Sequence, residues 1–207
     1  MLFKINTLEE YEKQINMSYD ELVEYLLNKY GPSSEDYFLE SSYEKFLKGI
    51  NKGITNGKHA RTSEGLYCHH IDENKFKSLC CSNFIKLQNV PFDYQRKDRL
   101  VYCDLIEHAI LHILIAVEDK RKGKWEKDEL KLGIGGYIDY LRPRIINYYM
   151  KGFIPSYEWK QNIKNKIKLS KNEIRKLVDK MDERLMNDYP ITLEDILIAD
   201  LNSPNPY

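Results

Sequence analysis

The sequence predicts a predominantly helical α+β protein in which a small ββα unit is embedded between two helical segments. Apolar residues recur at helical spacing over most of the chain, which is typical of amphipathic helices. In the middle of the chain, two short apolar runs of strand length precede one long apolar helix pattern. We therefore divide the chain into an N-terminal helical segment (1–63), a ββα core (64–122) and a C-terminal helical segment (123–207), and expect one compact unit.

Composition limits the class of protein. The 207 residues fit one domain with appendages, and 32 Lys and Arg balance 32 Asp and Glu, so the formal net charge is zero. This balance argues against a chain that is basic throughout, but it allows a local basic face. The chain has no apolar run of membrane-spanning length and no signal-peptide core, and its four cysteines match no disulfide framework. We therefore expect a cytoplasmic protein with no membrane span.

The N-terminal segment carries two helix-start signals, at residues 7–10 and 18–21. In each, a serine or threonine is followed three residues later by glutamate, which is the pattern of a capping box. Gly31-Pro32 ends the second helix. A further helix is predicted from Ser34 to Ile50, and residues 52–63 form a polar, basic loop.

The central segment predicts two strands and a helix. The first strand is expected around Leu66–Cys68 and the second at Leu100–Cys103, with a long irregular connection over residues 72–98. Asp104 is a good N-cap, and Glu107 at the third helical position completes a capping box. The helix that follows, DLIEHAILHILIAVEDKRK, is apolar on more than one face, so we expect most of it to be buried.

Helices also dominate the C-terminal segment. One is predicted over Tyr137–Met150, with a kink at Pro143. Ser170 with Glu173 opens another, and Thr192 caps a last short one.

Four of the five histidines lie in the central segment. His108 and His112 are four residues apart on the predicted helix, so their side chains share one face and can converge on one divalent ion. His69 and His70 end the first strand, where adjacent side chains point to opposite sides. One of them can therefore join the metal while the other faces the substrate, which gives three ligands and one free base, a pattern typical of a hydrolytic site.

Here the sequence resembles a known family. YCHHI, followed by LVYCDLIEHAILHILIA, is similar to the HNH (ββα-metal, His-Me finger) endonucleases, especially phage and bacterial members. The resemblance covers about residues 64–117. Both motifs occur in the family's order, and a strand leads directly into the helix, which makes the pair more specific than either motif alone.

The resemblance implies a role for each histidine. His69, His108 and His112 would bind one divalent metal (Mg, Mn, Ni or Zn), and His70 would be the general base that activates water. The metal would bind the scissile phosphate and stabilise the leaving 3′ oxygen. DNA is the expected substrate, ahead of RNA, and cleavage would leave 5′-phosphate and 3′-hydroxyl ends. A protein partner and the oligomeric state stay open.

One position departs from the family pattern. The asparagine that orients the base lies nine residues before the first histidine of HxxxH, where this chain has Arg99. Arginine has no acceptor and cannot reproduce the bonding of an amide, although it could act in catalysis by contacting a phosphate. Asn89 or Asn83 could supply the amide instead. Asp98, beside Arg99, and Asp72, just after the histidine pair, are candidate supporting residues.

If the chain is a nuclease, its positive charge must be segregated on a DNA-binding face. We expect this face in the basic stretches 52–61, 96–99 and 160–176, with the acidic residues of 8–44 and 179–200 turned away. The candidate contacts are Lys58, Arg61, Arg96, Lys97, Lys164, Lys166 and Lys168.

Three alternatives remain. The ββα unit could be a catalytically degenerate module, a nucleic-acid- or protein-binding regulator or inhibitor of phage or plasmid origin; Arg99 and the neutral charge favour this. A zinc knuckle could use Cys68, Cys103 and one of Cys80 and Cys81, although free buried thiols are the default. A zincin-type hydrolase fits poorly, because Glu107 precedes the first histidine instead of following it.

Overall fold

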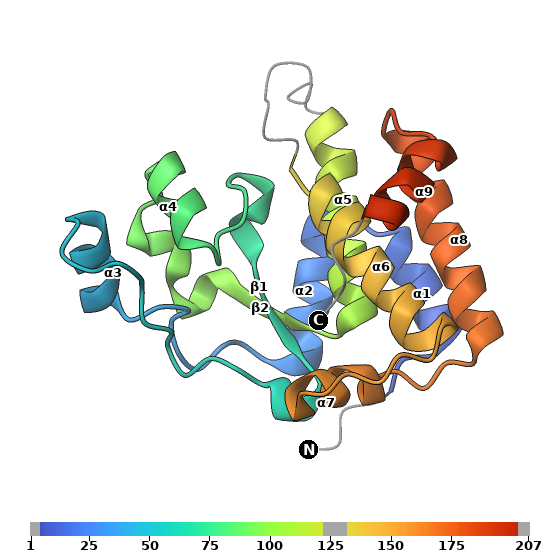
Figure 1. Cartoon of the computed structure of the whole chain (residues 1–207), viewed down its shortest axis with the longest axis horizontal. Helices are drawn as coiled ribbons and strands as arrows, with labels where there is room; N and C mark the ends of the chain where they lie inside the picture. The colour runs from blue at the N-terminus through green and yellow to red at the C-terminus, as the bar shows by residue number, and fades with distance from the viewer. Residues whose placement is uncertain (1–4, 122–131, 203–207) are drawn as a thin grey trace.

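The computed structural model describes residues 5–121 and 132–202, and it shows the predicted fold class: helices surround a small two-stranded sheet (Figure 1). Strands β1 (Tyr67–His70) and β2 (Leu100–Cys103) are antiparallel, with His69 opposite Val101 and His70 opposite Leu100. Both strands lie where the sequence predicts them. In these residues, no helix is long and apolar enough to cross a membrane.

Strand β2 leads through Asp104 directly into the central helix α5 (Leu105–Arg121). The Asp104 Oδ1 atom accepts hydrogen bonds from the backbone N–H groups of Ile106 and Glu107, both at 2.9 Å. Glu107 Oε2 accepts the Asp104 backbone N–H at 2.8 Å. The predicted capping box is therefore confirmed, and it joins the sheet rigidly to the helix.

The N-terminal helices α1 (Leu8–Ile15) and α2 (Tyr19–Tyr30) both begin with the predicted capping boxes. Gly31, at φ +77°, ends α2 in a conformation that favours glycine. Both helices pack against α5, and their apolar faces join the main hydrophobic core. Side chains of this segment also reach the cap of α5: Tyr30 and Lys29 donate to Glu107.

The helix predicted over residues 34–50 is wrong in its first half, because α3 spans only Glu40–Leu47. The preceding residues are extended and pair with distant loops. The Tyr37 backbone N–H donates to the Gln95 carbonyl at 2.8 Å, and Phe38 forms a bridge with Asn56. These long-range backbone bonds form in place of local helical bonds, and they position Tyr37 next to the histidines.

The connection between the strands is more regular than predicted. It packs against the segment around α3 in a second small core, where Ile85 of the connection meets Phe38 and Tyr43, on the side of the sheet opposite α5 (Figure 1). Apart from this cluster, the connection is a series of short helical turns. These are η2 (Ile71–Asn74), α4 (Ser82–Gln88), η3 (Phe92–Gln95) and η4 (Lys97–Arg99).

The C-terminal segment is helical, as predicted, but its first helix alternates between two geometries. The α-helical turn α6 (Arg142–Ile145) lies between two π-helical stretches, η5 (Gly136–Leu141) and η6 (Ile146–Met150). The Arg142 N–H, for example, bonds to the Tyr137 carbonyl, five residues back. Pro143 lies at the start of α6, where its missing N–H is tolerated. The kink there stays a prediction.

Of the remaining helices, α8 covers the other side of α5, α7 packs on the turn Thr62–Glu64 before β1, and α9 packs on η5. Helix α8 opens with the predicted Ser170–Glu173 capping box and packs against α5 and α1, on the side of α5 away from β1 (Figure 1). The boundary predicted between residues 122 and 123 lies outside the described residues. The three helices are α7 (Glu158–Lys166), α8 (Lys171–Asp188) and α9 (Leu193–Asn202).

Candidate metal centre

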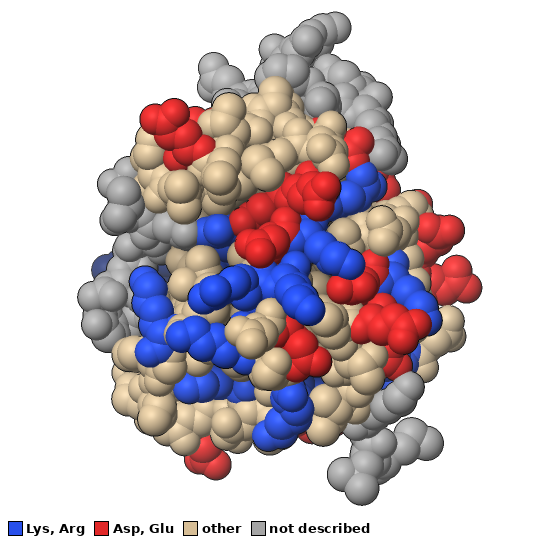
Figure 2. All heavy atoms as spheres, turned by 90° about the vertical axis from the view of Figure 1, so that its right-hand side faces the viewer, with Lys and Arg blue, Asp and Glu red and all other residues tan. Residues whose placement is uncertain are grey.

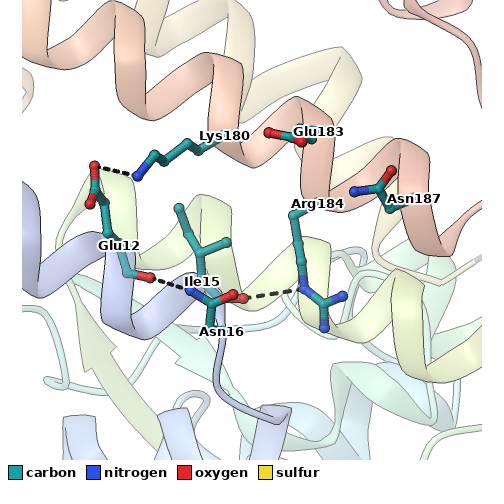
Figure 3. Close-up of a pocket in the computed structure, with 7 residues that line it drawn as sticks. All are labelled: Glu12, Ile15, Asn16, Lys180, Glu183, Arg184 and Asn187. Carbon is teal, nitrogen blue, oxygen red and sulfur yellow. Dashed lines mark hydrogen bonds and ion pairs between the residues drawn. The ribbon is translucent and has the colours of Figure 1, made fainter.

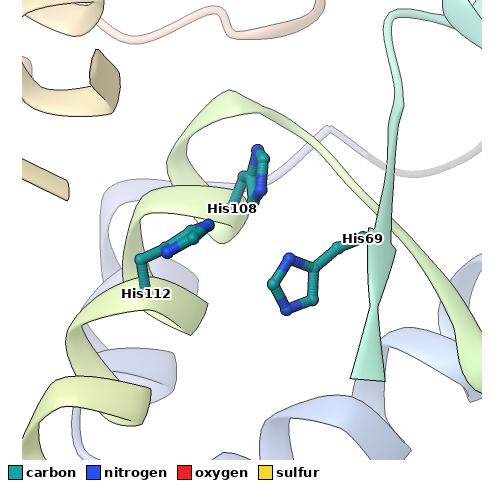
Figure 4. Close-up of side chains that lie close together, drawn as sticks. All are labelled: His69, His108 and His112. Atoms are coloured by element: carbon teal, nitrogen blue, oxygen red, sulfur yellow. The ribbon is translucent and has the colours of Figure 1, made fainter. Parts of the chain in front are cut away.

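Three of the predicted histidines lie together. His69 of β1 faces His108 and His112 of α5, and one ring nitrogen from each lies within 4.8 Å of the others (Figure 4). The ring centroids are 4.9–5.3 Å apart. The i, i+4 spacing on the helix and the alternation on the strand produce this arrangement directly. Among the described residues it is the one such group of metal-ligating side chains.

The hydrogen bonds of Tyr19 determine which ring nitrogen of His69 carries the proton. The Tyr19 hydroxyl donates its single proton to the Ile71 carbonyl at 2.7 Å, so toward His69 Nε2, at 3.2 Å, it acts as an acceptor. His69 Nε2 must then carry the ring proton, which leaves a lone pair on Nδ1. An outer hydrogen bond of this kind is how proteins orient a metal-binding imidazole.

The remaining polar atoms of the cluster fit a cation. The Nδ1 atoms of His69, His108 and His112 are all buried, and none has a hydrogen-bond partner in the described structure. Buried polar atoms are normally paired, so unpaired nitrogens on three adjacent imidazoles need an explanation. A divalent ion of the Mn, Ni or Zn type would accept one lone pair from each ring, and the ring nitrogens nearest Glu73 are Nδ1 of His69 and Nε2 of His112.

Burial keeps these rings in the metal-binding form. It lowers the pKa of His69 and of His108 well below the ordinary value, and the neighbouring histidines lower both further. Burial also lowers the pKa of His112 to about 4. All three imidazoles are therefore neutral at physiological pH, as a ligand must be.

Glu73 is a site residue that the sequence analysis missed. Its Oε2 atom lies 3.5 Å from His112 Nε2 and 3.8 Å from His69 Nδ1, and burial raises the pKa of its carboxyl to about 7. The neighbouring residue Asp72, which was the predicted supporting group, instead binds Lys75 Nζ at 2.6 Å. The turn η2 decides which of the two acids faces the histidines, and the sequence contains no signal for that choice.

His70 extends to the other side of the strand, where a buried amide holds it. Its Nε2 atom lies 2.9 Å from Gln95 Oε1, while Gln95 Nε2 donates to the Leu79 carbonyl at 3.2 Å. Because the amide oxygen can only accept, His70 Nε2 carries the proton and Nδ1 carries the free lone pair. Burial lowers the pKa of His70 to about 4, so the ring is neutral. The Tyr37 ring packs on it, with centroids 4.3 Å apart.

The other predicted catalytic and supporting residues lie elsewhere. Arg99 is 47% exposed and pairs with Asp72 at 3.7 Å. Asn89 is the left-handed C-cap of α4, at φ +50°, and Asp98 is exposed in η4. The pocket described next is lined by none of Arg99, Asp72, Asn89 and Asp98. The amide that was expected from Asn89 or Asn83 comes instead from Gln95.

One pocket of about 460 Å³ is lined both by the three-histidine group and by His70. A smaller hollow of about 260 Å³ adjoins it and shares Glu73. A substrate in the pocket would therefore meet both the three-histidine group and the candidate base.

The cysteines form no zinc knuckle in the described structure. Cys68, Cys80 and Cys81 line the same pocket, while Cys103 is buried in β2. All four are free thiols, and none belongs to a metal-ligating group of three.

The predicted DNA contacts in the loops are partly engaged within the protein. Arg61 makes two hydrogen bonds to Glu64, both at 2.6 Å, and Arg96 pairs with Asp93 at 3.0 Å. None of these candidates lines the histidine pocket. The other two loop candidates are exposed lysines, Lys58 and Lys97.

The basic run 160–176 also lies away from the pocket. Lys164 donates to the Phe153 carbonyl at 2.7 Å, Lys166 is half-buried over the Tyr30 ring, and Lys168 is exposed. Figure 2 shows basic side chains gathered across the middle and lower left of the α8 side of the molecule, with acidic side chains above them and to their right. This face lies across α5 from β1, so it does not continue into the histidine pocket.

A further hollow, of about 300 Å³, lies between α1 and α8 (Figure 3). Its polar groups are satisfied locally: Lys180 pairs with Glu12 at 2.8 Å, and Arg184 donates to the Ile15 carbonyl. No histidine or cysteine lines it. It therefore offers neither an imidazole nor a thiol.

No protein-family model, curated protein or solved structure matches this chain. The class of the site therefore rests on its own geometry, which is a three-histidine centre beside a fourth, amide-held histidine on a ββα unit.

Proposed function

We propose that the protein is a metal-dependent endonuclease of the HNH type, which hydrolyses phosphodiester bonds in DNA. One observation carries the proposal: adjacent residues of β1 face two different environments that open into one pocket. His69 joins His108 and His112, while His70 is held by Gln95. The sequence order of these groups matches the family that the motifs resemble.

The chain's own residues divide the chemistry between them. His69, His108 and His112 would hold one divalent cation, and that ion, when bound, supplies Lewis-acid stabilisation of charge on the phosphate and the leaving oxygen. His70 takes the proton from the attacking water at Nδ1, because Gln95 occupies Nε2. Since burial lowers the pKa of His70, the ring is unprotonated and ready to act as a base at neutral pH.

The experiment is cleavage of supercoiled plasmid DNA with Mg²⁺, Mn²⁺, Ni²⁺ or Zn²⁺, with EDTA as the blank. Wild type is compared with His70→Ala and with His59→Ala. His59 is the matched control, because it packs on the same Tyr37 ring but lies outside the three-histidine group. We expect His70→Ala to lose about a hundredfold or more in rate and His59→Ala to keep most of its activity. Equal cleavage by wild type and His70→Ala would overturn the assignment.

The rival hypothesis of a degenerate regulatory module was favoured by Arg99 in place of the family's asparagine. Gln95 provides a buried amide for His70 from a different loop position, which removes that support. Metal analysis separates the two proposals. A non-exchangeable zinc in a protein without cleavage activity would favour the regulatory module.

A further inference from the structure

One arginine lines the histidine pocket and has no anionic partner among the described residues. Arg144 lies on α6, between the two π-helical stretches, and its Nη1 atom donates to the Tyr67 hydroxyl at 3.1 Å. Its Nε atom is buried without any hydrogen-bond partner in the described residues. Local π-helical insertions often re-aim side chains at functional sites, and here they flank this arginine on both sides.

Arg142, a neighbour of Arg144 on the same helix, has the kind of carboxylate partner that Arg144 lacks among the described residues. Two residues earlier, Arg142 binds the Asp182 carboxylate with Nε and Nη2 at 2.8–3.0 Å, and this pair is buried. Arg144 has no carboxylate within ion-pair distance among the residues described. Burying part of a guanidinium without an anion is unfavourable, so this position is suited to an anion from outside the protein.

Tyr67 connects Arg144 to the histidines. The ring of Tyr67 lies 5.3 Å from that of His108, centroid to centroid, and its hydroxyl accepts the Arg144 bond. The Tyr67 hydroxyl only accepts in that bond, so its own proton can be donated to a ligand. An anion held here would receive bonds from both side chains, next to the three-histidine group.

We propose that Arg144 and Tyr67 form a phosphate-binding subsite of the pocket, which holds a backbone phosphate of the nucleic acid beside the metal centre. The identity of the ligand rests on the proposed nuclease function, but phosphate binding by Arg144 does not require cleavage. Arginine suits this task because its planar fork can give two parallel hydrogen bonds to a phosphate. The subsite also supplies positive charge at the pocket, which the remote basic face of α8 does not.

The test measures binding of a fluorescein-labelled 12-base-pair DNA duplex by anisotropy, in EDTA, so that no cleavage occurs. Wild type is compared with Arg144→Gln, Arg144→Lys and Tyr67→Phe. Lys48→Gln is the matched control, since Lys48 is an exposed cation at the end of α3, outside the pocket and outside the basic stretches expected to face DNA. Thermal unfolding checks that each variant folds, and Tyr67→Phe, which removes only a hydroxyl, serves if Arg144→Gln does not fold.

We expect Arg144→Gln to weaken binding about tenfold and Tyr67→Phe about threefold, with Arg144→Lys between wild type and Arg144→Gln. Lys48→Gln should bind nearly as wild type does. The slope of log K against log salt should fall by about one in Arg144→Gln. Binding that is no more sensitive to Arg144 and Tyr67 than to Lys48, including absence of binding by wild type, overturns the subsite. Arg144-dependent binding in a protein that cleaves nothing would retain the subsite and reject the nuclease.

Discussion

The amide oxygen of Gln95 lies 2.9 Å from Nε2 of His70, and both side chains are almost completely buried. The amide nitrogen of Gln95 donates a hydrogen bond to the Leu79 carbonyl, and this bond fixes the orientation of the amide. This pair sets the tautomer of the candidate base, and it explains how the site accommodates an arginine at position 99.

Removing this amide should impair catalysis more than binding. We expect Gln95→Ala to lower kcat about 10- to 100-fold with KM nearly unchanged, because His70 loses the contact that keeps Nδ1 unprotonated and in place. Steady-state cleavage of a short DNA duplex gives both constants. Asn83→Ala is the matched control, as Asn83 is an exposed amide of the same connection. A change in KM alone would mean that Gln95 does not position the base.

The hydroxyl of Tyr19 should govern metal affinity. Tyr19→Phe removes the acceptor that holds the proton on His69 Nε2, so we expect metal binding to weaken about 10- to 100-fold. Titration calorimetry with Ni²⁺ or Zn²⁺ measures this directly. Tyr25→Phe, on the same helix, should bind as wild type does. Identical affinities for the Tyr19 and Tyr25 variants would show that the hydroxyl does not set the ligand's tautomer.

Metal should also stabilise the fold. An ion that binds only the native state adds about 2.7 kcal/mol at a concentration 100 times its Kd, and it would bind one ring nitrogen from each of the three histidines. We therefore expect Tm to rise by several degrees with Ni²⁺ or Zn²⁺ and to return to its starting value with EDTA. His108→Ala should lose this response, and His59→Ala should keep it. A rise of the same size in both variants would place the bound ion elsewhere.

The parts of the site that follow from local rules were predictable from the sequence. Strand alternation separates His69 from His70, and helical spacing joins His108 to His112, so the cluster of three histidines and the separate position of the fourth could be predicted. The capping box at Asp104 likewise fixed the junction of strand and helix.

The rest depends on contacts between distant segments. Gln95 and Tyr37 reach His70 because their backbones bond to each other across 58 residues. Glu73 faces the histidines, and Asp72 does not, only because of the turn that follows β1. Arg144 enters the pocket from beyond the ββα unit altogether. No local pattern encodes these placements, since each is decided by how the connections pack.

The buried ion pair between Lys29 and Glu107 should contribute strongly to stability. Lys29 Nζ lies 2.7 Å from Glu107 Oε1, with the two side chains 12% and 0% exposed, and it joins α2 to the cap of α5. Lys29→Met leaves the Glu107 carboxylate buried without its cation, so we expect a loss of about 3 kcal/mol in the free energy of unfolding. Lys13→Met is the matched control, because Lys13 and Glu9 form an exposed pair, 66% and 77% exposed, worth about 0.5 kcal/mol or less. Urea denaturation of both variants measures the difference, and equal losses would mean that the ββα unit does not depend on this link to the N-terminal helices.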